Sequence, residues 1–378
     1  MSDGLEILQK ELETYQDTAK KYYNFEQAVK LILNSIYGAF GNSWFYFFNV
    51  NIAESITKQG KNAIQFTEKA INYYFFNIWE KDFEVHQKMG IKVTGKIVKP
   101  VAIYSDTDSL FLSLEEVLKK TDWKGNRKDF VLSLNEHKLD AFFKSVLKNY
   151  SEAMNTECYL DFELEKISRS AVWLAKKKYI EDVVFKSPNV HYESTSKISS
   201  KGTEIIQSST PIFVREKLKE LMKYVICEED VQASKVVNKL SELKRQFKLQ
   251  EIDNISISYR VNNYRKYILN DYDIFEINTG CPFNVRAAGY YNYLLNNSKY
   301  KEKYRMIEDS DKIKIYITEN QANNYFAYLP GEFPKEIAPK IDYDQQFERV
   351  MIDPLNRILI AVGLPPLTSA LFYKKSLF

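Results

Sequence analysis

The chain has 378 residues, 45% of them hydrophobic, which is enough for two or three packed units with real cores. Its 53 basic and 50 acidic residues leave a net charge of +3, which excludes a surface that is basic throughout, so any nucleic-acid surface must be local. The apolar runs are shorter than the roughly 18 residues of a membrane helix and the first residues lack a signal-peptide pattern, so we expect a cytoplasmic protein without membrane contact.

The first part of the chain is predicted to be mainly helical. A helical pattern begins after a potential cap at Asn24 and ends at Gly41, and a second one covers about 50–78. The run "VAIYSDTDSLFLSL" at 101–114 then predicts two strands joined by a tight turn.

The second part of the sequence predicts strands between two helical regions. Helices are expected at about 133–154 and strands at about 158–187. Beyond Gly202, "TPIFVREKLKELMKYVI" opens with a threonine cap and a proline at the first helical position, and another helix is expected at about 230–248. We therefore place a domain boundary near 202–210.

The turn of the predicted hairpin carries two acidic residues. Side chains two apart in a strand project the same way, so Asp106 and Asp108 are expected to present their carboxylates together. Adjacent carboxylates repel unless a cation lies between them, and such oxygen donors suit Mg²⁺. The alternative is a plain hairpin turn, because Asp and Thr both favour turns.

The predicted first helix contains "KLILNSIYGAFG", with two different faces. Helical spacing aligns Lys30, Asn34, Tyr37 and Gly41 in one stripe beside an apolar face. This stripe combines a cation for a phosphate, an amide, an aromatic ring that can stack, and a glycine that permits close approach. The alternative is an ordinary amphipathic helix with a solvated polar side.

A lysine run lies within the predicted strand region. In "AKKKYIEDVVF", Lys176, Lys177 and Lys178 precede Tyr179 and offer cations toward a phosphate backbone beside an aromatic ring. The alternative is a solvated face, or lysines that protect an edge strand from pairing.

In this order, "KLILNSIYG", "YSDTDS" and "KKKY" resemble motif B, motif C and the K-K-R-Y motif of the C-terminal half of family B DNA polymerases. Ser105 stands where motif C usually has glycine, and Lys178 stands where Arg is usual. The segments "KGTEIIQSSTP" and "CPFNVRAAGYYNYLL" are similar to the palm-to-thumb passage and thumb of polymerases from T-even-type bacteriophages. The resemblance extends over nearly all of the chain from about residue 24.

The resemblance implies an α+β fold: a palm with an antiparallel sheet, partial helical fingers and a mostly helical thumb. The corresponding divisions are 1–43 for the fingers remnant, 44–205 for the palm and 206–378 for the thumb. It also implies a DNA-directed DNA polymerase acting on dNTPs and primer-template DNA in replication, in the cytoplasm of a host cell if it is phage-encoded. The alternative is a non-catalytic DNA-binding or assembly factor derived from a polymerase.

The resemblance also assigns roles to individual residues. Asp106 and Asp108 would be catalytic, Lys30 would contact the triphosphate, and the primer-template would meet the lysine run. The implied groups are, for nucleotide binding, Lys30, Asn34 and Tyr37; for DNA binding, Lys176, Lys177, Lys178 and Tyr179; and for two Mg²⁺ ions, Asp108, Asp106 and Glu163.

A third essential aspartate, from motif A, has no counterpart in this sequence, and neither has the exonuclease signature. Either the chain is a piece of a longer polymerase or the polymerase is naturally split. We favour the split, because Met1 offers a start and residues 2–23 could form a helix that pairs with another subunit. We therefore expect an obligate heterodimer with an N-terminal polymerase and exonuclease polypeptide, which shares the Mg²⁺ ions.

The last residues suggest one more partner. In "ALFYKKSLF", Ser376, Leu377 and Phe378 resemble the beginning of the tail with which related phage polymerases dock in a sliding clamp. The alternative is a frayed apolar terminus.

Overall fold

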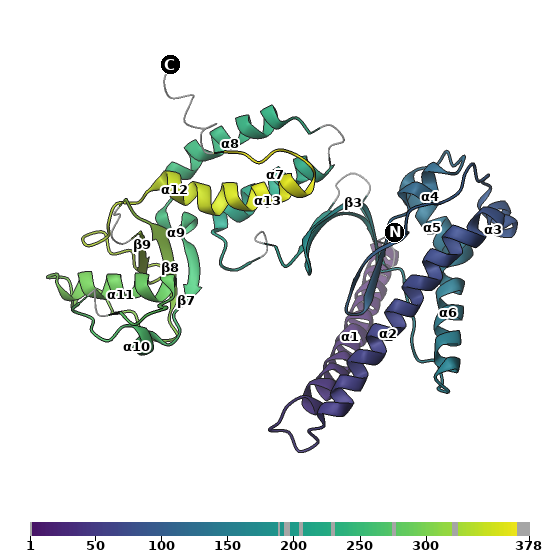
Figure 1. The fold of residues 1–378 in the computed structure, drawn as a ribbon, viewed down its shortest axis with the longest axis horizontal. Helices are drawn as coiled ribbons and strands as arrows, with labels where there is room; N and C mark the ends of the chain where they lie inside the picture. The colour runs from purple at the N-terminus through teal and green to yellow at the C-terminus, as the bar shows by residue number, and fades with distance from the viewer. Residues whose placement is uncertain are drawn as a thin grey trace. The chain divides into compact units, whose positions relative to one another are not determined.

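The structure is a computed structural model. It describes residues 2–187, 190–192, 197–203, 207–227, 231–273, 277–319 and 324–368. The chain forms two compact units, Met1–Leu164 (unit 1) and Glu165–Phe378 (unit 2) (Figure 1). The fold is mixed α+β, and the described strands form antiparallel sheets of two, four and three strands.

Unit 1 begins with α1 (Ser2–Phe40), a helix of 39 residues that ends at Gly41 as predicted. The predicted start after Asn24 is wrong, because the helix already runs from Ser2. Residues 2–23 are rich in Glu, Lys, Gln and Leu and contain no proline, so their intrinsic preference continues the helix without a break. Asn24 is therefore an internal helical residue.

The second predicted helix is confirmed. The side chain of Asn49 accepts hydrogen bonds from the backbone N–H groups of Asn51 and Ile52 and so caps α2 (Val50–Tyr73). The helical path continues through one π turn, η1 (Tyr74–Ile78), and one 3₁₀ turn, η2 (Trp79–Lys81).

The predicted hairpin is also confirmed, as β1 (Ala102–Asp106) and β2 (Ser109–Leu112). Its base belongs to the core of unit 1, where Val101 and Ala102 are buried with Ile71, Tyr74 and Trp79. The remaining elements of unit 1 are α3 (Phe83–Met89), α4 (Glu115–Lys119), α5 (Arg127–Leu134), η3 (Asn135–Leu139) and α6 (Asp140–Ala153).

Unit 2 begins with a sheet whose central strand is β4 (Lys178–Lys186), paired with β3 (Lys166–Ala175), β5 (Val190–His191) and β6 (Lys197–Lys201). The strands predicted over about 158–187 are confirmed from Lys166 onward, whereas residues 158–165 belong to no described strand, so that part of the prediction is wrong.

The elements that follow the sheet are mostly helices. They are α7 (Ile212–Cys227), α8 (Ala233–Lys248), α9 (Ile252–Ile255), β7 (Ile257–Arg260), α10 (Tyr264–Tyr267), α11 (Phe283–Asn296), β8 (Lys312–Ile317), β9 (Tyr325–Tyr328), α12 (Tyr343–Phe347), η4 (Glu348–Ile352) and α13 (Asp353–Ala361). The helices predicted after Pro211 and at about 230–248 correspond to α7 and α8.

One core runs through unit 2. Strand β3 contacts both α7 and α13, and Ile180 of β4 is buried in the same cluster as Leu218 of α7. The predicted boundary near 202–210 lies inside this unit, and the division into fingers, palm and thumb stays a prediction. The tail at 371–378, with its predicted clamp contact, lies outside the described residues. Among the helices that the structure describes, none is both long and apolar enough to cross a membrane.

Candidate functional site

The β1–β2 hairpin reverses direction over two residues. Asp106 pairs with Ser109, which leaves Thr107 and Asp108 as the loop, and the backbone N–H of Asp108 donates to the carbonyl of Asp106 at 2.7 Å. Thr107 has a φ of 60°, in the left-handed region that a β-branched residue rarely adopts. Ser105 lies within β1 opposite Leu110, so the positive φ of this turn falls on Thr107 and the serine in place of the usual glycine fits an extended backbone.

The two aspartates share the hairpin end but not the same environment. Asp106 is 5% exposed and accepts a hydrogen bond from the hydroxyl of Thr107 at 3.2 Å, whereas Asp108 is exposed. The sequence argument assumed that side chains two apart project alike, which holds only for a continuous strand. The positive φ between them interrupts that alternation.

The hairpin end offers oxygen donors of a kind that suits a metal ion. Two carboxylates offer hard oxygen donors, and Mg²⁺ commonly takes one or two protein carboxylates together with waters and substrate phosphates. Glu163 is exposed in the segment after α6, where its charge helps to raise the pKa of Lys144, although the hydrogen bond from Lys144 to Asp140 contributes more. In the described ranges, no three His, Cys, Asp or Glu side chains form a group that could hold a metal ion, so Glu163 as a ligand stays a prediction.

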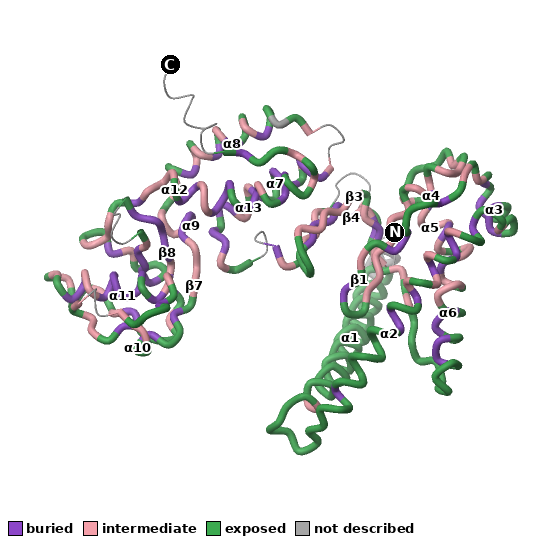
Figure 2. Tube along the Cα trace, viewed as in Figure 1, coloured by how far each residue is buried: buried purple, intermediate pink, exposed green. Residues whose placement is uncertain are grey.

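The predicted nucleotide-binding residues all lie on α1. Lys30, Asn34 and Tyr37 are exposed at helical spacing, with Tyr37 43% exposed. They belong to a helix whose described side chains are exposed from residue 7 to residue 38 (Figure 2). The sequence therefore placed them on one helix, and the structure gives them free access to a ligand.

The lysine run occupies the turn between β3 and β4, in unit 2. Ala175 pairs with Lys178, so Lys176 and Lys177 form the loop, and Lys177 has a φ of 62°. We call residues 176–178 the lysine turn. All three lysines are exposed, two in the tight loop and Lys178 at the start of β4, so the run lies at a turn and not within a strand.

Tyr179, by contrast, is 4% exposed. Its ring lies 6.2 Å from that of Trp173, and the ammonium groups of Lys166 and Lys201 lie 5.6 and 5.8 Å from its centroid. Its predicted contact with DNA remains untested, and the structure shows that its ring is largely covered within the sheet. Sequence reasoning missed Lys166 and Lys201, because only strand pairing brings them to Tyr179.

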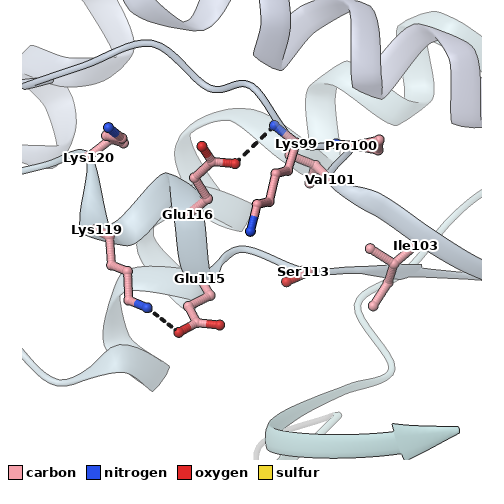
Figure 3. A pocket seen from close by; sticks show the side chains of 9 residues that line it. All are labelled: Lys99, Pro100, Val101, Ile103, Ser113, Glu115, Glu116, Lys119 and Lys120. Atoms are coloured by element: carbon pink, nitrogen blue, oxygen red, sulfur yellow. Dashed lines mark hydrogen bonds and ion pairs between the residues drawn. The ribbon is translucent and has the colours of Figure 1, made fainter.

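A cavity of about 330 Å³ lies beside the base of the hairpin (Figure 3). Three of its lining residues make local contacts with each other or with the backbone: Lys119 pairs with Glu115 at 2.5 Å, and Glu116 accepts a hydrogen bond from the backbone N–H of Lys99 at 3.0 Å. The cavity includes Ile103 but not the acidic end of the hairpin, so it is separate from the candidate site. Its lining consists of Lys99, Pro100, Val101, Ile103, Ser113, Glu115, Glu116, Lys119 and Lys120.

The chain thus offers two carboxylates at a hairpin end, an exposed lysine and phenol ring on one helix, and three lysines at a turn, which are groups that can bind a divalent cation or phosphates. Residues 6–361 match the family model described as DNA polymerase family B, and the chain belongs to this family.

Three relatives illustrate the extent of the similarity. The chain is 24% identical over 359 residues to the DNA-directed DNA polymerase of Escherichia phage RB69, covering 89% of this chain and 36% of that protein. It is 25% identical over 358 residues to the DNA-directed DNA polymerase of Enterobacteria phage T4, covering 89% and 37%. For the DNA polymerase catalytic subunit of Alcelaphine herpesvirus 1 (strain C500), the identity is 25% over 254 residues, covering 65% and 21%. The chain thus spans about a third of the length of the two phage polymerases.

Proposed function

We propose that this chain is the C-terminal part of a DNA-directed DNA polymerase, which extends a primer 3′ end by two-metal nucleotidyl transfer in DNA replication. A partner chain would supply the motif A aspartate and the exonuclease. The observation that carries the proposal is the hairpin end with Asp106 and Asp108, in a chain that belongs to DNA polymerase family B.

The residues of the hairpin fit a shared metal site. When bound, two Mg²⁺ ions would neutralise phosphate charge and lower the pKa of the primer hydroxyl that attacks the α-phosphate. Asp108, being exposed, can offer its carboxylate directly to an ion. Asp106 is buried and bonded to Thr107, so it would hold the turn in shape.

The exposed cations would hold the two substrates. Lys30 would bind the triphosphate of the incoming dNTP, with Asn34 and Tyr37 along the same face of α1 beside the sugar and base. The lysine turn would bind the primer-template backbone through phosphates, which positions DNA without reading its sequence.

The surface of α1 supports a partner chain. Apolar side chains recur at alternating spacings of four and three residues from Leu8 to Tyr22 and again from Val29 to Phe40, with Glu26 between the two runs. This repeat is typical of a seam that packs against another helix. Most of this seam is exposed in unit 1 (Figure 2), with Leu12 at 56% and Leu33 at 62%, whereas Phe40 at its end is partly buried. An exposed apolar surface of this kind marks a site of interaction. The seam residues are Leu8, Leu12, Tyr15, Ala19, Tyr22, Val29, Leu33, Ile36 and Phe40.

The test of catalysis is reconstitution. The chain is mixed with a polypeptide that carries the motif A segment and exonuclease of a family B polymerase, and extension of a labelled primer is measured with dNTPs and Mg²⁺. We expect extension by the mixture, its loss with Asp108→Ala, and no loss with Asp140→Ala, which removes a half-buried acid paired with Lys144. If Asp108→Ala in an active mixture has no effect, the chain is the non-catalytic factor instead. Extension by this chain alone would show that the partner is unnecessary.

The test of the partner surface uses the seam. Leu12→Lys/Leu33→Lys should weaken association at least tenfold in calorimetry, because two charges would enter an apolar interface. Both side chains are exposed in this chain, so its thermal unfolding should not change. Leu249→Lys is a matched control, because Leu249 is 85% exposed and belongs to unit 2 and not to the seam of α1. Unchanged association of the seam variant would refute this surface.

A further inference from the structure

The end of β6 lies against the lysine turn. In the antiparallel β4–β6 pair, Ser200 is opposite Ile180 and Lys201 is opposite Tyr179. Continuing this register by one residue brings Gly202 opposite Lys178, the last residue of the turn. Gly202 has a φ of 66°, a backbone conformation that glycine adopts without a steric penalty.

The approach of the two backbones leaves no room for a side chain at residue 202. A Cβ there would lie 2.3 Å from the carbonyl oxygen of Lys177, 3.4 Å from its carbonyl carbon and 3.3 Å from Cγ of Lys178. The first two atoms are backbone atoms of the turn and cannot rotate away as a flexible side chain would. Lys177 is itself in the left-handed region, so the turn has little freedom to yield.

We infer that Gly202 is a positioning residue for DNA binding: its bare backbone holds the lysine turn in the shape that presents Lys176, Lys177 and Lys178 to phosphates. The same strand end also places Lys201 over the ring of Tyr179, so one short segment supports both the turn and the residue that follows it. The inference rests on the proposed contact between the lysine turn and the primer-template.

The consequence is that DNA binding depends on a residue with no charge and no side chain. Contacts with phosphates contribute to affinity only where the spacing of the lysines matches the spacing of phosphates in DNA. A displaced turn therefore keeps its charges and loses contacts. Loss of contacts lowers both the affinity and the number of counterions released on binding. Simple loss of folded protein would lower only the active fraction.

The experiment measures binding of the whole 378-residue chain to a fluorescein-labelled primer-template duplex by anisotropy, over a range of salt concentrations. Gly202→Ala should weaken binding about tenfold and reduce the slope of log affinity against log salt by about one to two. Gly280→Ala is the matched control, because Gly280 has a φ of 77° in the same unit and a Cβ there meets nothing within 4 Å. It should leave affinity and slope unchanged.

A second comparison covers the case in which Gly202→Ala fails to fold. A glycine at residue 177 should let the turn move away from a side chain at residue 202. The double variant Lys177→Gly/Gly202→Ala is therefore compared with the single variant Lys177→Gly. We expect the double variant to bind several-fold more weakly, because Lys176 and Lys178 are then misplaced. Acetylation of lysines with and without DNA, read by mass spectrometry, should show reduced protection of these two residues.

The outcomes separate the inference from the function on which it rests. If Lys177→Ala weakens binding while Gly202→Ala binds with wild-type affinity and slope, or the double variant equals Lys177→Gly, the role of Gly202 is refuted and the DNA contact stands. If alanine at all three turn lysines leaves affinity and slope unchanged, the DNA contact and the inference both fail.

Discussion

Asp106 and Asp108 lie on either side of Thr107, and the backbone N–H of Asp108 donates to the carbonyl of Asp106 at 2.7 Å, yet only Asp106 is buried. We therefore expect the same substitution to have different effects on stability at the two positions. Burial ties Asp106 to the stability of unit 1, whereas exposure leaves Asp108 available for a ligand.

We predict that Asp106→Ala lowers the free energy of unfolding by about 1–3 kcal/mol, because it leaves the Thr107 hydroxyl without this acceptor and opens space at a buried position. Asp108→Ala should change it by less than about 0.5 kcal/mol, as expected for an exposed loop residue. Urea denaturation measures both values, and primer extension by the reconstituted mixture should be lost in both variants. Equal stability losses would contradict the difference in burial.

Lys30 should affect nucleotide binding more than turnover. Lys30→Ala in the reconstituted mixture is expected to raise KM for dNTPs about 10- to 100-fold, the loss typical of a charge-assisted hydrogen bond of about 1.5–3 kcal/mol. Steady-state extension at varied dNTP concentrations measures it. Lys58→Ala on α2 removes another exposed lysine, paired with Glu54, and should leave KM unchanged. A fall in kcat with constant KM would assign Lys30 a different role.

The pair between Arg169 and Asp182 should matter for the sheet of unit 2. Asp182 is fully buried, and Nε of Arg169 donates to its carboxylate at 2.8 Å, a hydrogen bond that raises the pKa of the arginine. Asp182→Ala is expected to destabilise the chain by about 1–3 kcal/mol, because it removes a buried carboxylate that accepts two hydrogen bonds, whereas water can still hydrate the exposed guanidinium of Arg169. Chemical denaturation measures the change. Glu84→Ala, which removes the exposed partner of Lys88, should have little effect.

His86 should make unit 1 sensitive to acid. It is 5% exposed beside the ring of Trp79 at 4.7 Å, and burial lowers its pKa although the nearby charge of Asp82 opposes this shift. The unfolded chain then binds a proton at the ordinary pKa of about 6.5 while the folded chain resists it, so stability falls as the pH drops below that value.

Thermal unfolding between pH 7.5 and 5 tests this dependence. His86→Phe keeps an aromatic ring in the core and should flatten the loss of stability on acidification. His137→Gln serves as a control, because His137 is outside the buried core, and should retain the wild-type dependence. An identical pH profile for His86→Phe and the wild type would exclude His86 as the cause.

Local patterns in the sequence were sufficient for much of the fold. The helix at 50–78 and the hairpin at 101–114 depend on side chains a few residues apart and on turn chemistry at Asp106–Ser109, so periodicity alone predicts them. The same holds for Lys30, Asn34 and Tyr37, whose spacing places them on one helical face.

The extent of α1 shows where a local signal misleads. Asn24 followed by Gln27 has the pattern of a helix cap, but the helix formers before it extend the helix to Ser2. The strands predicted at about 158–187 begin later than expected, at Lys166, because an alternating pattern becomes a strand only where another strand pairs with it.

The sequence by itself determined which residues could do the chemistry: two carboxylates at a turn, a lysine, an amide and a phenol on one helical face, and three consecutive lysines. Only the tertiary structure decided that Asp106 is buried and Asp108 exposed, that Tyr179 lies beneath Lys166 and Lys201, and that Gly202 touches the backbone of Lys177. The reason is physical: secondary structure follows from interactions within a few residues, whereas burial and cross-strand contact join residues more than ten positions apart, whose partners no local pattern specifies.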